Sequence, residues 1–154
     1  MKVRIFSILI FLTCCFASCK KETSLQEFIT DSWQTTYLKI DMITAHKTDS
    51  LQVYEDKFDN NPQFIAQSIY NKDGTFSAWF LTKENKKVSE SIGTWSVLKD
   101  SLFVKFNYGG RDMKVGYHIT KTKDGFVGKS KYDWDEDGDF DDILTMKTKR
   151  LNTK

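Results

Sequence analysis

The sequence predicts an all-β protein: an eight-stranded up-and-down antiparallel β-barrel preceded by a short N-terminal helix. From residue 33 onward, apolar and polar residues alternate with a period of two in successive runs. Short turns rich in aspartate and glycine separate these runs, as they do in hairpins. Aromatic residues make up 14% of the chain and proline occurs once, a composition that favours strands. Closure into a barrel hides the strand edges, although a two-sheet sandwich would fit the same pattern.

The first residues of the chain predict an export signal. Lys2 and Arg4 give a positively charged start, and residues 5–16 form an apolar run. This run is too short for a transmembrane helix, which needs about 20 apolar residues. Small residues then lead into Cys19. The alternatives to a lipoprotein signal are an ordinary cleaved signal and an uncleaved anchor.

The segment Ala-Ser-Cys at 17–19 resembles the lipobox of Gram-negative bacterial lipoproteins. The resemblance implies a signal peptide over 1–18 and a lipidated tether over 19–24 with the lipid on Cys19. Residues 25–154 then form the predicted barrel domain. Several acyl chains hold a protein stably to a bilayer, so the domain needs no apolar face of its own. Some surface-exposed lipoproteins carry an acidic export tag after the cysteine, whereas residues 20–22 contain a single acidic residue. We therefore expect an anchor in the outer membrane with the domain facing the periplasm.

Composition limits the possible partners of the chain after the signal, which we call the body. An 18-residue signal leaves 136 of the 154 residues, which suits one domain and one core. Cys14 and Cys15 lie in the signal, so no disulfide is expected in the body. Without Lys2 and Arg4, basic and acidic residues are equal at 21 each, and no basic stripe for nucleic acid is present. We expect a monomer.

The elements follow in chain order. A helix is predicted over 23–32, where Ser24 and Glu27 have capping-box spacing. The polar segment 46–61 is predicted to be a long loop, with a helical turn over 51–58 as an alternative. The alternating runs predict strands over 33–43, 64–70, 76–81, 88–98, 102–107, 113–120, 126–132 and 143–151.

Four features of the body resemble the lipocalin-like lipoproteins of Gram-negative bacteria. Trp33 opens the first strand, the sequences at 70–76 (YNKDGTF) and 93–102 (GTWSVLKDSL) resemble two family segments, and Arg150 closes the last strand. Asp31 stands where lipocalins usually place a glycine. The resemblance implies a barrel with one open mouth. It also implies that Trp33 plugs the closed end beneath the Arg150 side chain in a cation–π contact.

Two non-enzymatic functions are open. The first is the binding of a small apolar or amphipathic ligand in a hollow barrel. The second is a structural or interaction role for a filled barrel with a calcium-stabilised acidic loop. For the first, the candidate pocket residues are aromatic, although a plain core is the simpler interpretation for most of them: Trp79, Trp95, Phe103 and Tyr117.

The segment 133–142 (DWDEDGDFDD) is the candidate metal site. Carboxylates at 133, 135 and 137 followed by Gly138 match the first half of an EF-hand calcium loop, but the glutamate of position 12 is replaced by Leu144. The segment is therefore not an EF-hand, and it predicts either a weak Ca²⁺ site or a solvated hairpin tip. The candidate ligands are Asp133, Asp135, Asp137, Asp139, Asp141 and Asp142.

Motifs for catalysis are missing from the sequence. It contains no Gly-rich phosphate loop, no His-Glu-x-x-His helix and no Gly-x-Ser-x-Gly elbow. The two histidines, His46 and His118, fall in a polar loop and on the polar side of a predicted strand. We therefore expect that the protein is not an enzyme.

Overall fold

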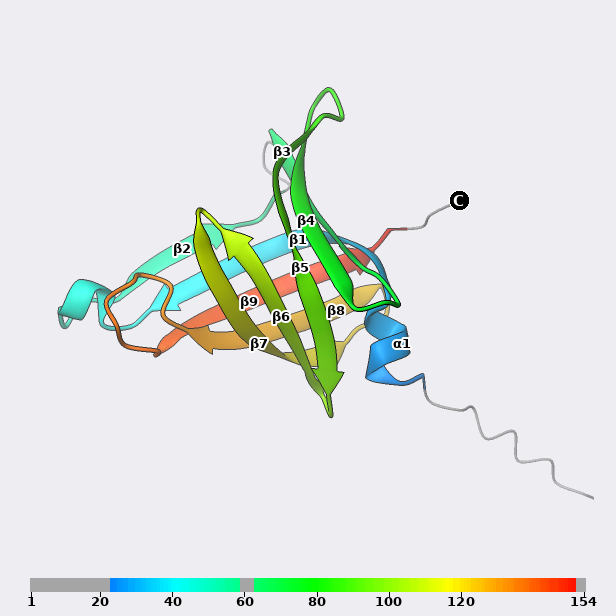
Figure 1. Cartoon of the computed structure of the whole chain (residues 1–154). Coiled ribbons are helices and arrows are strands. Elements are labelled where there is room, and N and C mark those ends of the chain that lie inside the picture. The colour runs from blue at the N-terminus through cyan, green and yellow to red at the C-terminus, as the bar shows by residue number, and fades with distance from the viewer. Residues whose placement is uncertain (1–22, 59–62, 152–154) are drawn as a thin grey trace, which may run out of the picture.

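The computed structural model describes residues 23–58 and 63–151, and it shows a closed antiparallel barrel (Figure 1). The predicted all-β class and eight-stranded barrel are confirmed, with one strand in addition to the eight. The predicted signal peptide over 1–18 and the lipidation residue Cys19 lie outside the described residues.

Each strand pairs with the next one in the sequence, except that β3 pairs with β1 and not with β2. The sheet order is β2-β1-β3-β4-β5-β6-β7-β8-β9, and pairing of β1 with β9 closes the barrel. The strands are β1 (Asp31–Met42), β2 (Gln52–Asp56), β3 (Phe64–Tyr70), β4 (Thr75–Thr82), β5 (Lys87–Leu98), β6 (Ser101–Tyr108), β7 (Arg111–Lys121), β8 (Gly125–Tyr132) and β9 (Asp142–Arg150).

A short helix, α1 (Leu25–Ile29), lies at one end of the barrel (Figure 1). It begins with the predicted capping box: the Glu27 amide donates to Ser24 Oγ at 3.1 Å, and the Ser24 amide donates to Glu27 Oε2 at 3.3 Å. The helix is shorter than predicted because β1 starts at Asp31. Ile29 is fully buried, and its carbonyl accepts from Trp33 Nε1 at 2.9 Å. The helix therefore covers this end of the core.

The prediction of a long loop or helical turn over 46–61 is wrong in its central part. Residues Gln52–Asp56 form β2, which pairs with the outer part of β1 from Leu38 to Met42. A short 3-10 turn, η1 (Ala45–Lys47), connects the two strands. The sequence QVYED has no half-buried alternation, and Val53 and Tyr54 are about half exposed. Pairing with β1, and not burial, makes this segment a strand.

The wall of the barrel opens at the end opposite α1. On one edge, β1 pairs with β3 only through residues 31–34, and with β2 through residues 38–42. Strands β3, β4 and β5 therefore diverge from β1 and β2 beyond this point (Figure 1). The barrel has one closed end, under α1, and one open end.

Trp33 fills the closed end. It has no exposed surface and packs edge-on against Phe126, with 4.9 Å between ring centroids. The structure places the Arg150 guanidinium 4.4 Å from the centroid of the Trp33 ring, the contact that the resemblance implies. Arg150 also donates to the Phe28 carbonyl at 2.8 Å and forms an ion pair with Asp31. The aspartate in the usual glycine position thus supplies a partner for the arginine.

Close strand packing explains Gly93 in the segment GTWSVLKDSL. A Cβ atom at this position would lie 1.9 Å from the Lys105 carbonyl oxygen of the neighbouring strand. We expect Gly93→Ala to lower the free energy of unfolding by about 1–3 kcal/mol, because backbone atoms must move. Urea unfolding of Gly93→Ala and Gly128→Ala checks this. A Cβ at Gly128 would be 3.6 Å from its nearest neighbours, which are side-chain atoms at an ordinary contact distance, so equal losses in both variants would contradict the packing argument.

Candidate functional site

Two adjacent cavities occupy the interior of the barrel. The deeper one has a volume of about 200 Å³ and is lined by Tyr70 and Tyr117, among others. The other lies at the open end and has a volume of about 820 Å³. Three side chains line both cavities, so the two lie next to each other: Phe80, Phe106 and Tyr108. We call the smaller cavity the chamber and the larger cavity, at the open end, the mouth.

Small side chains on β3 and β4 leave the space for the chamber. Across these strands, Tyr70 pairs with Phe76, Ser68 with Ala78, and Ala66 with Phe80. Because pairs two residues apart share a face of a sheet, these six side chains point to the same side. All six line the chamber, and three of them are alanine or serine. Along this face, Tyr70 and Phe76 place large rings at one end and Phe80 places one at the other. The small side chains between them leave the space open.

The chamber carries no charge at neutral pH. Its ionisable lining residues within the described ranges are three tyrosines: Tyr108, which is exposed, and Tyr70 and Tyr117, which are almost fully buried. Burial raises the pKa of the Tyr70 and Tyr117 hydroxyls well above the usual value, because a phenolate would lose its hydration there. An uncharged group is the suitable occupant of this space.

The predicted pocket residues divide into two groups. Tyr117 and Trp79 line the chamber, and the Lys87 ammonium lies 3.6 Å from the centroid of the Trp79 ring. Trp95 and Phe103 line neither the chamber nor the mouth, which corrects that part of the prediction.

Trp95 and Phe103 have other roles. Trp95 is buried; its Nε1 donates to the Asn71 carbonyl at 2.9 Å and its ring packs against Tyr70. It therefore holds a turn against the core. Phe103 alternates with the buried Leu102 and Val104, so its ring lies on the other face of β6, against Gly116.

Several lining residues were not predicted. Phe76 and Phe106 follow the alternation of β4 and β6, so the period of two contains the signal for them. Tyr54 and Phe58 line the mouth from the segment predicted to be a loop, where the sequence has no such signal.

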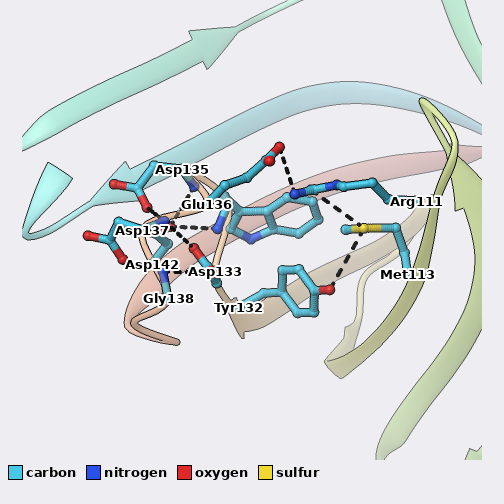
Figure 2. A network of polar contacts seen from close by, with 10 residues as sticks. Arg111, Met113, Tyr132, Asp133, Asp135, Glu136, Asp137, Gly138 and Asp142 are labelled. Atoms are coloured by element: carbon cyan, nitrogen blue, oxygen red, sulfur yellow. Dashed lines mark hydrogen bonds and ion pairs between the residues drawn. The ribbon is translucent and has the colours of Figure 1, made fainter. Parts of the chain in front are cut away.

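One ion pair lies at the mouth. Arg111 Nη1 is 2.6 Å from Glu136 Oε1, and Arg111 Nη2 lies 3.7 Å from the sulfur of Met113 (Figure 2). Asp56 also lines the mouth, and its Oδ1 accepts from the Phe58 amide at 2.8 Å. Among the described residues, the charged lining groups of the two cavities are therefore all in the mouth.

Part of the predicted metal-ligand set comes together in the β8–β9 loop. Asp133, Asp135 and Asp142 each have a carboxylate oxygen within 4.8 Å of the others (Figure 2). Gly138 has φ of +96°, a left-handed conformation that suits glycine, so it makes the sharp turn expected of it. The three carboxylates offer hard oxygen donors of the kind that Ca²⁺ takes.

Backbone amides hold these carboxylates in place. Asp133 accepts from the amides of Asp137 and Gly138, at 3.1 and 3.2 Å. Asp142 accepts from the amides of Trp134 and Asp135, at 2.6 and 3.2 Å, and is 1% exposed. Burial raises the pKa of Asp142, and its hydrogen bonds oppose that rise. The loop is thus folded around its own acidic side chains.

The other three predicted ligands lie outside this group. Asp137 accepts from the amides of Asp139, at 2.8 Å, and of Lys47, at 3.0 Å, and these bonds lower its pKa. Asp141 accepts from Thr44 Oγ1 at 3.1 Å, and Asp139 is exposed. Asp137 and Asp141 therefore attach the acidic loop to the β1–β2 connection.

In the described part of the chain, no helix combines the length and apolar character needed to cross a bilayer. Comparison of the sequence with protein-family models and with curated proteins finds no match.

Proposed function

We propose that the protein is a lipid-anchored envelope protein that holds a small apolar or amphipathic ligand inside its barrel. The observation that supports this most is the pair of adjacent cavities of about 200 and 820 Å³. Pockets of about 300–1,000 Å³ lined by apolar and aromatic groups are typical of small-molecule sites. A filled structural barrel, the alternative, would leave no such volume.

The fold also favours a particular orientation on the membrane. The chain enters the barrel through α1, at the closed end (Figure 1). The four residues between Cys19 and Ser24 span at most about 14 Å. A lipid on Cys19 would therefore keep α1 near the bilayer and the mouth directed away from it. We propose that ligand enters from the aqueous side, in the periplasm.

The binding function is tested with an uncharged fluorescent probe, N-phenylnaphthylamine. Wild-type protein is expected to bind one equivalent with enhanced fluorescence. In Ala78→Trp the indole would occupy the chamber, because Ala78 lines it, so probe uptake should fall at least about tenfold.

Ser77→Trp is the matched control. Residue 77 precedes Ala78, so its side chain lies on the opposite face of β4 and uptake should be unchanged. No uptake by folded wild-type protein, or equal uptake by both variants, would contradict the proposal.

We also propose that the acidic loop binds Ca²⁺ weakly, as the second candidate function. The cluster of Asp133, Asp135 and Asp142 supports this, since three carboxylates within 4.8 Å repel each other unless a cation or water relieves them. We expect a dissociation constant of about 10⁻⁴–10⁻³ M, as in extracellular modules.

A calcium titration that follows Trp134 fluorescence and the melting temperature tests the metal site. Ca²⁺ should raise the melting temperature of wild-type protein and of Asp139→Asn, whose side chain is outside the cluster, but not of Asp133→Asn. An unchanged melting temperature at millimolar Ca²⁺ would rule out the site.

A further inference from the structure

We infer that the ligand is an amphiphile with a cationic head group, an amine or quaternary ammonium, which lies at the mouth between aromatic rings and the Asp56 carboxylate. This rests on the proposed binding function and names the ligand class for the same site. The tail would lie in the uncharged chamber, and the head would lie where the charged side chains are.

The charge balance of the mouth favours a cation. Its charged lining residues within the described ranges are Asp56, Glu136 and Arg111. Arg111 and Glu136 are 2.6 Å apart and neutralise each other, which leaves the negative charge of Asp56. The adjoining segment 133–142 adds six aspartates. The open end of the barrel therefore attracts cations and repels anions.

Aromatic rings line the same cavity as this charge. Tyr54 and Tyr108 line the mouth although they are 49% and 58% exposed, and Trp134 lines it from the acidic loop. Burial raises the pKa of Tyr54, and the charge of Asp56 and the nearby Tyr108 contribute to the rise, which is consistent with a compact group. Aromatic faces together with a carboxylate are the groups that recognise ammonium ions.

An anionic head group would have no free partner of this kind. Arg111 is the cationic lining residue of the mouth in the described ranges, and Glu136 already occupies its guanidinium. A carboxylate or phosphate would have to displace Glu136 and leave it close to the acidic loop. The anion would then take the place of Glu136 on Arg111, and the freed Glu136 carboxylate would repel it.

The test compares head groups on one tail. Dodecyltrimethylammonium, dodecanol and dodecanoate, each below its micellar concentration, compete with N-phenylnaphthylamine for purified protein. We expect the ammonium compound to bind roughly tenfold more tightly than the alcohol, and the carboxylate to bind most weakly. The inference is overturned if the carboxylate or the alcohol binds as tightly as the ammonium compound.

Three variants separate the charges. Asp56→Asn keeps an oxygen for the Phe58 amide and should remove most of the preference for ammonium. Asp124→Asn, the same change in the β7–β8 turn at the closed end, should keep it. Arg111→Gln leaves Glu136 without its partner and should strengthen ammonium binding. If the mouth instead bound an anion through Arg111, the same change would weaken binding.

The outcomes for the two proposals are distinct. If dodecanol displaces the probe but ammonium has no advantage, the head-group inference fails and the binding function stands. If no compound displaces the probe and the probe itself does not bind, both fail.

Discussion

Replacement of Trp33 by alanine is expected to lower the free energy of unfolding by about 3–5 kcal/mol. The side chain is completely buried at the closed end and packs on Phe126 and Phe28. Its removal leaves a cavity beneath Arg150 and an unsatisfied Ile29 carbonyl, the acceptor of the indole N–H at 2.9 Å. Chemical denaturation monitored by circular dichroism measures the loss.

Trp33→Phe is the control for this prediction. It keeps an aromatic ring beneath Arg150 but removes the hydrogen bond to Ile29, so a smaller loss is expected. A Trp33→Ala protein as stable as Trp33→Phe would show that the plug contributes little. If the Ala variant does not fold at all, the Phe variant alone gives the measurement, and a loss below about 0.5 kcal/mol would contradict the account.

Replacement of Asp142 by alanine is the second large effect, with an expected loss of about 2–3 kcal/mol in the absence of metal. The buried carboxylate accepts from the amides of Trp134 and Asp135, and alanine leaves both without a partner. The β8–β9 loop should also lose its order, which hydrogen exchange of these amides would detect as faster exchange.

Asp142→Asn separates the structural role of this residue from a metal-binding role. One oxygen of Asp142, Oδ2, accepts both amides, so the asparagine oxygen can replace it. We expect Asp142→Asn to stay near wild-type stability without Ca²⁺, and to lose the stabilisation by Ca²⁺. Equal destabilisation by alanine and asparagine would contradict this division.

The barrel was predictable because its signals are local. Alternation in the strands at 113–120 and 126–132, and Asp-Gly turns such as Asp73-Gly74, depend on neighbouring residues only. Strand β2 was not predicted because its side chains are mostly exposed and show no alternation. Its strand conformation depends on backbone pairing with β1. Pairing of this kind leaves no periodic signal in the segment itself.

The site was only partly predictable for a similar reason. The aromatic content of the strands predicted rings in the interior, but the division between chamber and core depends on which neighbours are small, such as Ala66 and Ala78. Trp95 could not be distinguished from a lining residue before its bond to Asn71 was seen. The acidic motif predicted six candidate ligands, whereas burial and hydrogen bonds bring three together.

The central claim is that the barrel interior is hollow and apolar, and crystals of the protein pressurised with xenon test it most directly. Xenon enters dry apolar cavities and is visible by its scattering. The account predicts a bound xenon atom in the chamber between Tyr70, Phe76 and Tyr117. A chamber filled by rearranged side chains, with no xenon density, would contradict it.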